Sequence, residues 1–201
     1  KLADPENLFA SDPRAERGME LREKYGIQPF TDNAAAVKEA DVVVLSLKPQ
    51  RLSPVLEELK GNIPEKALVL SIIAGATIEK MSTGLGHDKI IRTMPNTPAR
   101  IGEGITVWVA SDAVSDAQKK QARTILSALG EEVFVEDEYY LDMATALSGT
   151  GPAYVYMFME AMIDAGVHMG FPRRISEKLV VQTMRGSVNF YEKNDVHVAA
   201  L

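Results

Sequence analysis

The chain has 201 residues, of which 46% are apolar and 25% charged, with 14 Gly, 10 Pro and no Cys. This composition is typical of a globular protein with one or two domains, and it excludes the disordered, collagen and coiled-coil classes. Without Cys the chain has no disulfides, thiolate metal sites or cysteine nucleophiles. A net charge of −6 without a cluster of Lys and Arg argues against a nucleic-acid partner.

The sequence also carries no pattern typical of membrane proteins. The longest nearly apolar stretch, 67–76, is about half of the roughly 20 residues that a spanning helix needs. Residues 1–5 contain no apolar signal core. We therefore expect a cytoplasmic protein with a small-molecule ligand and no membrane partner. Because the chain lacks an initiator Met and reaches an apolar strand within a few residues, we also expect it to be a fragment.

Short apolar runs alternate with helical runs from residue 7 to about residue 136. The expected strands are 8–11, 27–31, 41–46, 67–73, 89–93, 105–110 and 132–135. The helices between them are expected to start at Asp12 (N-cap), Asp32 (N-cap), Ser53, Thr77 and Ser115, the last in a capping box with Gln118. This order predicts a doubly wound, Rossmann-like α/β fold with a mostly parallel sheet. The strand 41–46 is so apolar that we expect it to be buried on both faces.

The pattern changes after residues 136–138, beyond which helical segments dominate. The expected helix 152–169 is apolar almost all round, which is typical of a helix buried in a core or against a partner chain. A break at 170–172 separates it from a second helix at 173–193. We therefore expect an α/β domain over 1–137 and an all-α dimerisation domain over 138–201.

The dinucleotide fingerprint Gly-x-Gly-x-x-Gly is absent. If a strand carrying it preceded residue 1, the strand 8–11 would end beside the adenosine ribose of a bound dinucleotide. Ser11, Asp12 and Arg14 would then lie there: Arg14 and the helix amides suit a 2′-phosphate, whereas Asp12 could bind a ribose hydroxyl and favour NAD. Alternatively, Asp12 is only an N-cap and Arg14 is a solvated side chain.

Two further segments follow predicted strands, where ligands of open α/β sheets bind. Lys48, held by Pro49 after the strand 41–46, is a candidate anion contact, or else a solvated Lys at the strand edge. Ala74 and Gly75 after the strand 67–73 allow a flat ligand to approach the backbone, or simply permit a turn.

Two prolines, Pro95 and Pro98, enclose Asn96 and Thr97 after the strand 89–93 and should present them rigidly. The run 148–152 places two hydroxyls and backbone amides at the start of the apolar helix. It is either an anion pocket or a glycine-rich joint between domains.

The remaining titratable residues suggest no metal site and no paired acid/base carboxylates. We expect the histidines to be structural or exposed: His87, His168 and His197. We expect the acidic runs to be solvated faces: 57–58, 131–132 and 136–138.

In this order and spacing, the segments resemble the pyrroline-5-carboxylate reductase family over essentially the whole chain. The segments that carry the resemblance are 46–50, 74–75, 92–98, 147–154 and 166–173. Thr150 stands where the family pattern has Ser and keeps a hydroxyl. Family members also begin with a Gly-rich strand and loop and continue into a Ser-Pro-Gly-Gly-Thr segment. The resemblance therefore implies that residues 1–201 are the middle of such an enzyme and are inactive alone.

The resemblance implies hydride transfer from NAD(P)H to the C=N bond of 1-pyrroline-5-carboxylate, giving L-proline in the final step of its biosynthesis. It implies NADP(H) as the cofactor with NAD(H) as the alternative, a dinucleotide-binding domain over 1–137, and a helical substrate and dimerisation domain over 138–201 that forms a homodimer or a higher homo-oligomer. The implied cofactor contacts are Ser11, Arg14, Asn33, Ser46, Leu47, Lys48, Pro49, Ala74 and Gly75. The implied nicotinamide and substrate residues are Asn96, Thr97, Pro98, Ser148, Gly149, Thr150, Gly151 and Pro152. No residue is an obvious proton donor, so no catalytic acid is assigned.

Two other functions remain open. A related hydroxyacid dehydrogenase would share the sheet but should present a Lys from the helical segment to the nicotinamide, and Lys178 lies only in an ordinary Glu177–Lys178 pair. A non-catalytic dimerisation or regulatory module could keep the sheet and the helices without the missing loops.

Overall fold

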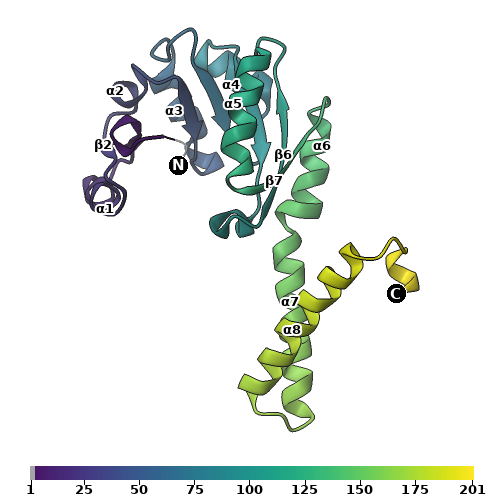
Figure 1. The fold of residues 1–201 in the computed structure, drawn as a ribbon. Coiled ribbons are helices and arrows are strands. Elements are labelled where there is room, and N and C mark those ends of the chain that lie inside the picture. The colour runs from purple at the N-terminus through teal and green to yellow at the C-terminus, as the bar shows by residue number, and fades with distance from the viewer. Residues whose placement is uncertain (1–2) are drawn as a thin grey trace. The chain divides into compact units, whose positions relative to one another are not determined.

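The computed structural model describes residues 3–201. The chain divides into two compact units, one ending at Gly149 and the other spanning Thr150–Leu201. The first unit is α/β and the second is a pair of helices (Figure 1). The predicted fold class is therefore confirmed, while the predicted domain boundary at residue 137 stays a prediction.

The first unit contains all seven expected strands, with ends shifted by at most two residues. They are β1 (Phe9–Ser11), β2 (Gln28–Phe30), β3 (Val42–Leu45), β4 (Leu68–Ser71), β5 (Ile90–Met94), β6 (Gly104–Ala110) and β7 (Gly130–Phe134). Its α-helices are α1 (Ala15–Tyr25), α2 (Asn33–Val37), α3 (Leu52–Leu59), α4 (Ile78–Leu85), α5 (Asp116–Ser127) and α6 (Tyr139–Ala144). The π-helix η4 (Thr145–Gly149) continues from α6, and the 3-10 helices are η1 (Pro5–Asn7), η2 (Pro49–Arg51) and η3 (Thr97–Ile101).

The strands form two sheets. β1 and β2 pair in parallel, and the other five lie in the order β3-β4-β5-β6-β7. Every neighbouring pair in the larger sheet is parallel except β5 and β6. Only η3 connects β5 to β6, and a parallel crossover needs about a dozen residues or more, so the chain turns back at this point.

The strand β3 is less buried than its sequence predicts. Val43 and Leu45 are buried, but Val44 is 50% exposed. Within residues 3–201, β3 pairs only with β4, and β1 pairs only with β2, so each has an edge without a neighbouring strand. Within the described residues, the prediction of burial on both faces was therefore wrong at Val44.

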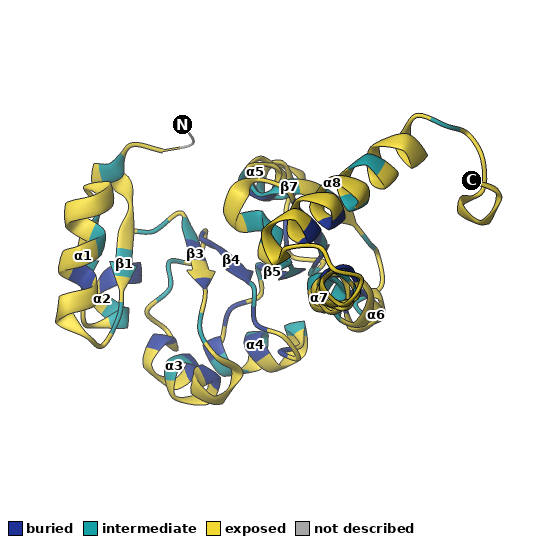
Figure 2. Cartoon of the chain, turned by 90° about the horizontal axis from the view of Figure 1, so that it is seen from below, coloured by how far each residue is buried: buried dark blue, intermediate teal, exposed yellow. Residues whose placement is uncertain are grey.

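The core lies on both faces of the larger sheet (Figure 2). One cluster packs Val69 against Leu52 of α3 and Met81 of α4. The next residue of the same strand, Leu70, points to the other face and packs in a cluster with Trp108 and Leu126 of α5. Alternation along β4 thus gives helices on both faces, as expected for a doubly wound sheet.

Local capping explains where three of the α-helices begin. Asp32, Thr77 and Ser115 accept backbone N–H groups at the starts of α2, α4 and α5, as predicted. The predicted N-cap at Asp12 was wrong: α1 starts after Arg14, and the Asp12 carboxylate accepts from the backbone N–H of Arg14 instead.

The second unit consists of α7 (Gly151–His168) and α8 (Arg173–Glu192), followed by the short helix η5 (Val198–Ala200). The two helices approach closely at Gly166, where an added Cβ would lie 2.1 Å from Ser176 Oγ. Few of its apolar side chains are buried, and Ile163 and Val180 are the large ones. No helix within residues 3–201 is both long and apolar enough to span a membrane.

Candidate functional site

The carboxyl ends of three parallel strands bring most of the predicted site residues to one sheet edge. β3, β4 and β5 run in the same direction, so their carboxyl ends meet at the same edge. Residues 46–49 follow β3, residues 74–75 follow β4 and residues 96–98 follow β5. This edge is the candidate site.

Gly75 provides open space at this edge. Its φ is +72°, so the turn after β4 needs a glycine. No heavy atom lies within 4 Å of a Cβ built on Gly75. Both sequence-based interpretations of this glycine are therefore compatible with its geometry: the turn requires it, and a flat ligand can approach its backbone.

The segment after β3 is exposed to solvent at the same edge. Ser46, Lys48 and Pro49 are exposed, and Leu47 is half-buried against the core below. Lys48 precedes the 3-10 helix η2, and its carbonyl accepts the N–H of Arg51. The backbone is thus folded at this point while the Lys48 ammonium group remains available to an anion.

Arg14 is held by Asp12 at the end of β1. Its Nε lies 3.0 Å from Asp12 Oδ1, and its Nη2 lies 3.1 Å from Asp12 Oδ2. This two-point hydrogen bond and the backbone N–H of Arg14 lower the pKa of Asp12 to about 2. The same contact raises the pKa of Arg14. A phosphate group that used Arg14 would therefore have to share this guanidinium with Asp12.

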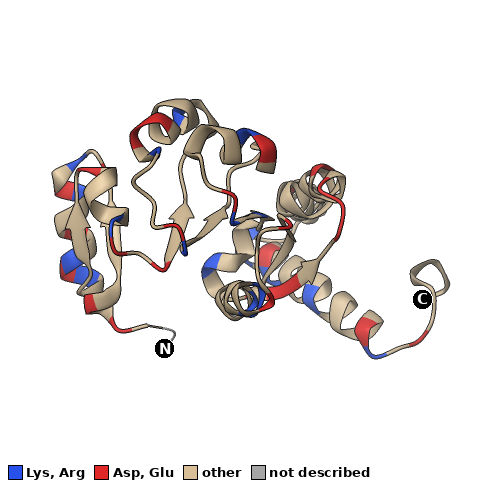
Figure 3. Cartoon of the chain, turned by 90° about the horizontal axis from the view of Figure 1, so that it is seen from above, with Lys and Arg blue, Asp and Glu red and all other residues tan. Residues whose placement is uncertain are grey.

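The helix that follows Arg14 is electrically balanced. Acidic and basic residues alternate along α1 (Figure 3). The charged residues of α1 are Glu16, Arg17, Glu20, Arg22, Glu23 and Lys24. Attraction of an anion to this end of β1 would thus depend on Arg14 and on the N-terminus of α1, which no side chain caps.

Asn33 is bound to a neighbouring helix. Its Nδ2 donates to Glu58 Oε2 at 2.9 Å, and its backbone N–H donates to Glu58 Oε1 at 3.2 Å. The predicted cofactor contact of Asn33 is therefore occupied within the protein by the start of α2 and the end of α3. Glu58 lies on an exposed face, as expected, and in addition binds Asn33 there.

Asn96 joins two other elements. Its Oδ1 accepts the N–H of Ile105 in β6 at 3.0 Å, and its Nδ2 donates to the carbonyl oxygen of Ser148 at 3.2 Å. Thr97 beside it is exposed, and Pro98 is half-buried. Asn96 thus fixes the sheet edge, and Thr97 is the side chain of the pair that faces solvent.

The run 148–152 is helical except at Thr150. Ser148 and Gly149 complete the π-helix η4, Thr150 follows in a bend, and Gly151 and Pro152 begin α7. Side-chain hydroxyls bond back to the preceding turn: Thr145 Oγ1 donates to the carbonyl of Leu141, and Ser148 Oγ donates to that of Ala144. Back-bonding of this kind distorts helices, and π-turns are frequent at functional sites.

The sequence patterns did not predict a cluster in which the buried Arg92 binds two partly exposed carboxylates. Arg92 of β5 is 3% exposed, and its guanidinium binds Glu138 at 2.9 Å and Asp142 at 3.0 Å. The acidic runs 131–132 and 136–138 were expected to be solvated. This is wrong for Glu138, which pairs with Arg92, and for Glu132, which pairs with Arg123. The sequence signal for an acidic partner is the charged Arg92 inside an otherwise apolar strand, because a buried Arg is almost always paired.

The histidines have structural or exposed positions, as predicted. His87 is buried, and its Nε2 lies 2.8 Å from the carbonyl oxygen of Ala67. His168 and His197 are exposed.

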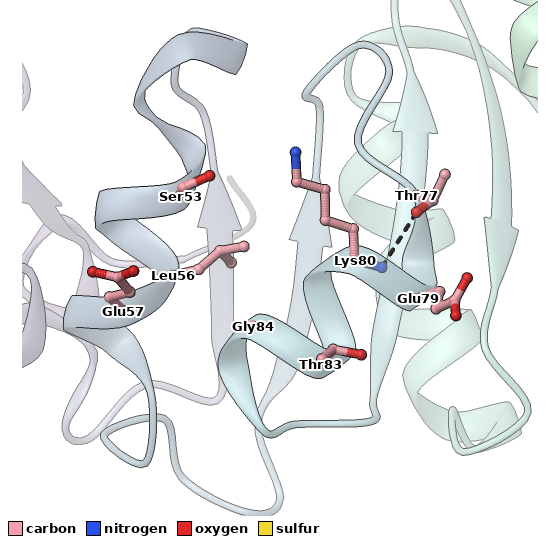
Figure 4. Close-up of a pocket in the computed structure, with 8 residues that line it drawn as sticks. All are labelled: Ser53, Leu56, Glu57, Thr77, Glu79, Lys80, Thr83 and Gly84. Carbon is pink, nitrogen blue, oxygen red and sulfur yellow. Dashed lines mark hydrogen bonds between the residues drawn. The ribbon is translucent and has the colours of Figure 1, made fainter.

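A separate cleft of about 430 Å³ lies between α3 and α4 (Figure 4). Its wall includes Ser53, Glu57 and Lys80, and none of the predicted site residues contributes to it. At its rim, Thr77 Oγ1 accepts the backbone N–H of Lys80. Because ligands of open α/β sheets bind at the carboxyl ends of the strands, we locate the candidate site at the sheet edge and not in this cleft.

Comparison with known proteins identifies relatives along the whole chain. The family model described as "Pyrroline-5-carboxylate reductase dimerisation" matches residues 138–201, and the one described as "NADP oxidoreductase coenzyme F420-dependent" matches residues 2–75. The pyrroline-5-carboxylate reductase of Synechocystis sp. is 38% identical over 201 residues, which are 100% of this chain and 74% of that protein.

Solved structures agree with this result. The pyrroline-5-carboxylate reductase of Coxiella burnetii has a TM-score of 0.90 at 34% identity, over 98% of this chain and 74% of that one. The pyrroline carboxylate reductase of Plasmodium falciparum with NADP bound has a TM-score of 0.87 at 34% identity, over 98% of this chain and 72% of that one. This chain therefore belongs to the pyrroline-5-carboxylate reductase family.

Proposed function

We propose that the protein reduces the C=N bond of 1-pyrroline-5-carboxylate to L-proline with NADPH as the reductant. The observation that carries this proposal is the sheet edge formed by residues 46–49, 74–75 and 96–98 in a member of this reductase family. A bound NADPH would supply the hydride, and the protein would orient the two reactants.

The residues at the edge fit a dinucleotide. Open space over Gly75 accommodates a flat group, the exposed Lys48 suits an anionic one, and Arg14 at the end of β1 suits a 2′-phosphate. We assign the adenosine side to Ser11, Arg14 and residues 46–49. We assign the nicotinamide side to residues 74–75, Thr97, Ser148 and Gly149, with Asn96 holding the backbone of Ser148 in place.

We also propose that the protein is a cytoplasmic homo-oligomer. The dimerisation model covers residues 138–201, and α7 exposes large apolar side chains that include Tyr156, Met157 and Phe158. A chain without Cys suits a reducing compartment.

The direct test follows NADPH oxidation and proline formation by the whole protein. We expect NADPH to be consumed in step with proline formation when 1-pyrroline-5-carboxylate is present, and not in its absence. Oxidation of a 2-hydroxy acid with NADP⁺ at a comparable rate, with no proline formed, would instead favour the hydroxyacid dehydrogenase alternative.

Two glycine variants test the location of the site. Gly75→Leu fills the open space at the sheet edge and should lower kcat/KM for NADPH by about tenfold or more. The matched control is Gly61→Leu, because Gly61 has a φ of +74° and equally open surroundings, but lies after α3 and away from the edge. Both variants introduce the same backbone strain, so equal losses of activity would contradict the placement of the cofactor over Gly75.

A further inference from the structure

One strand holds the segment 138–148 at both of its ends. Near the start of the segment, the guanidinium of Arg92 in β5 binds Glu138 and Asp142. Just beyond the end of the same strand, Asn96 Nδ2 donates to the carbonyl oxygen of Ser148. The helix α6 and the π-helix η4 between these contacts are therefore positioned from β5.

The Arg92 cluster also reaches the start of α4. Glu138 Oε1, which accepts from Arg92 Nη1, also accepts the backbone N–H of Ile78 at 2.9 Å. Ile78 is the first residue of α4 and lies three residues after Gly75. One carboxylate oxygen thus connects the segment after Gly75 with the segment that leads to Ser148, and both belong to the candidate site.

The far end of η4 lies against the end of β5. A Cβ added at Gly149 would lie 2.6 Å from Met94 Cε, so the backbone of Gly149 packs on the side chain of Met94. The bond from Asn96 to Ser148 is 3.2 Å long, close to the upper limit for an N–H···O contact. A movement of Ser148 by about 1 Å away from Asn96 would therefore break it.

Burial is distributed unequally in this cluster. The Arg92 side chain is 4% exposed, whereas those of Glu138 and Asp142 are 30% and 63% exposed. If the guanidinium is removed, water can hydrate both carboxylates. If the carboxylates are removed instead, the buried guanidinium is left without hydration. Removing Arg92 therefore leaves two carboxylates that water can reach and no unpaired charge in the interior, so this variant can test the position of the segment 138–149 apart from the stability of the fold.

We propose that Arg92 is a positioning residue for the reductase reaction. It touches neither reactant; by holding Glu138 and Asp142 it sets where Ser148 and Gly149 lie against Asn96 at the sheet edge. The proposal rests on the proposed function for its kinetic consequence, and on the structure alone for its effect on the segment 138–149.

The test is Arg92→Met in the whole protein, which keeps an apolar side chain of similar length and removes both ion pairs. We expect kcat to fall by about tenfold or more, because small misplacements of positioning groups are costly, while KM for NADPH changes by less than about twofold. Amide hydrogen exchange should become faster across residues 139–149. Arg92→Lys keeps the charge, but an ammonium group replaces the forked guanidinium that binds two carboxylates at once. Its kcat should therefore lie between those of Arg92→Met and the wild-type protein.

Arg123→Met is the matched control, because it breaks the pair of Arg123 Nε with Glu132 Oε1, 2.9 Å apart, between α5 and β7. It should leave kcat and exchange across 139–149 unchanged. A loss of thermal stability in Arg92→Met with normal kcat and normal exchange would overturn the proposal. If the wild-type protein forms no proline, the proposed function fails, and faster exchange across 139–149 in Arg92→Met alone would still support the positioning role.

Discussion

The two units of the chain use apolar residues in opposite ways. In the first unit, the large side chains of β4 and β5 are almost completely buried, for example Leu68, Leu70, Ile90 and Ile91 at 0–2% exposure. In the second unit, α7 exposes Tyr154, Tyr156, Met157 and Phe158 by more than half. The first unit therefore has a core of its own, whereas the two helices of the second unit leave a large apolar surface that they do not cover themselves.

The difference shows that apolar content does not by itself predict burial within a chain. The sequence of α7 is apolar almost all round, and a pair of helices can bury only the stripe along which they touch, here around Ile163, Gly166 and Val180. A sheet with helices on both faces covers both sides of each central strand. Large exposed apolar patches usually mark an interaction site, and the dimerisation family model over residues 138–201 supports a second copy as the partner.

The largest expected effect comes from a charge on the uncovered surface. Phe158→Asp should separate the oligomer, because truncating a central aromatic costs about 2 kcal/mol or more and the change occurs on both sides of a twofold interface. The total of about 4 kcal/mol weakens association by about a thousandfold. Light scattering over a dilution series would measure it. Met19→Asp is the control, since Met19 is 57% exposed on α1 of the first unit.

The second effect is a core deletion in the α/β unit. Leu70→Ala should lower the free energy of unfolding by about 2–5 kcal/mol, through lost burial and a residual cavity. This loss should be independent of protein concentration, whereas the stability of Phe158→Asp should depend on it. Denaturant titrations at two concentrations distinguish the cases. A concentration-dependent effect of Leu70→Ala would contradict the inference that the first unit is stabilised by its own core.

A smaller effect is expected at the edge of the α/β unit. Arg14→Ala should raise KM for NADPH by more than about tenfold and leave KM for NADH little changed, because only NADPH carries the 2′-phosphate. Steady-state kinetics with both cofactors provide the measurement. Equal changes would assign the discrimination to Asp12 rather than Arg14.

The smallest effect concerns the titration of Asp12. Arg14 lowers the pKa of Asp12 from its ordinary 3.8 to about 2. The folded-state pKa is depressed, so the stabilisation is complete above pH 3.8 and is lost as the pH falls through about 2. The carboxyl NMR signal of Asp12 should titrate near the lower value, and Arg14→Met should move its midpoint upward. An unchanged midpoint would mean that the pair does not persist in solution.

Sequence patterning determined the elements of the chain. Apolar runs predicted all seven strands, and the caps at Asp32, Thr77 and Ser115 are local hydrogen bonds between near neighbours, which a short segment encodes by itself. The strand-end segments 46–49, 74–75 and 96–98 were predicted because their place after parallel strands follows from the order of the elements.

Only the tertiary structure decided what the polar side chains do. Asn96 holds Ser148 and Asn33 holds Glu58, and these partners are 52 and 25 residues apart in the chain. The buried Arg92 likewise finds Glu138 at a distance of 46 residues. Which face of β3 stays open and which face of α7 stays uncovered also depend on neighbours brought together by folding. Local patterns encode hydrogen bonds between adjacent residues, whereas long-range partners exist only once the sheet has placed its strand ends side by side.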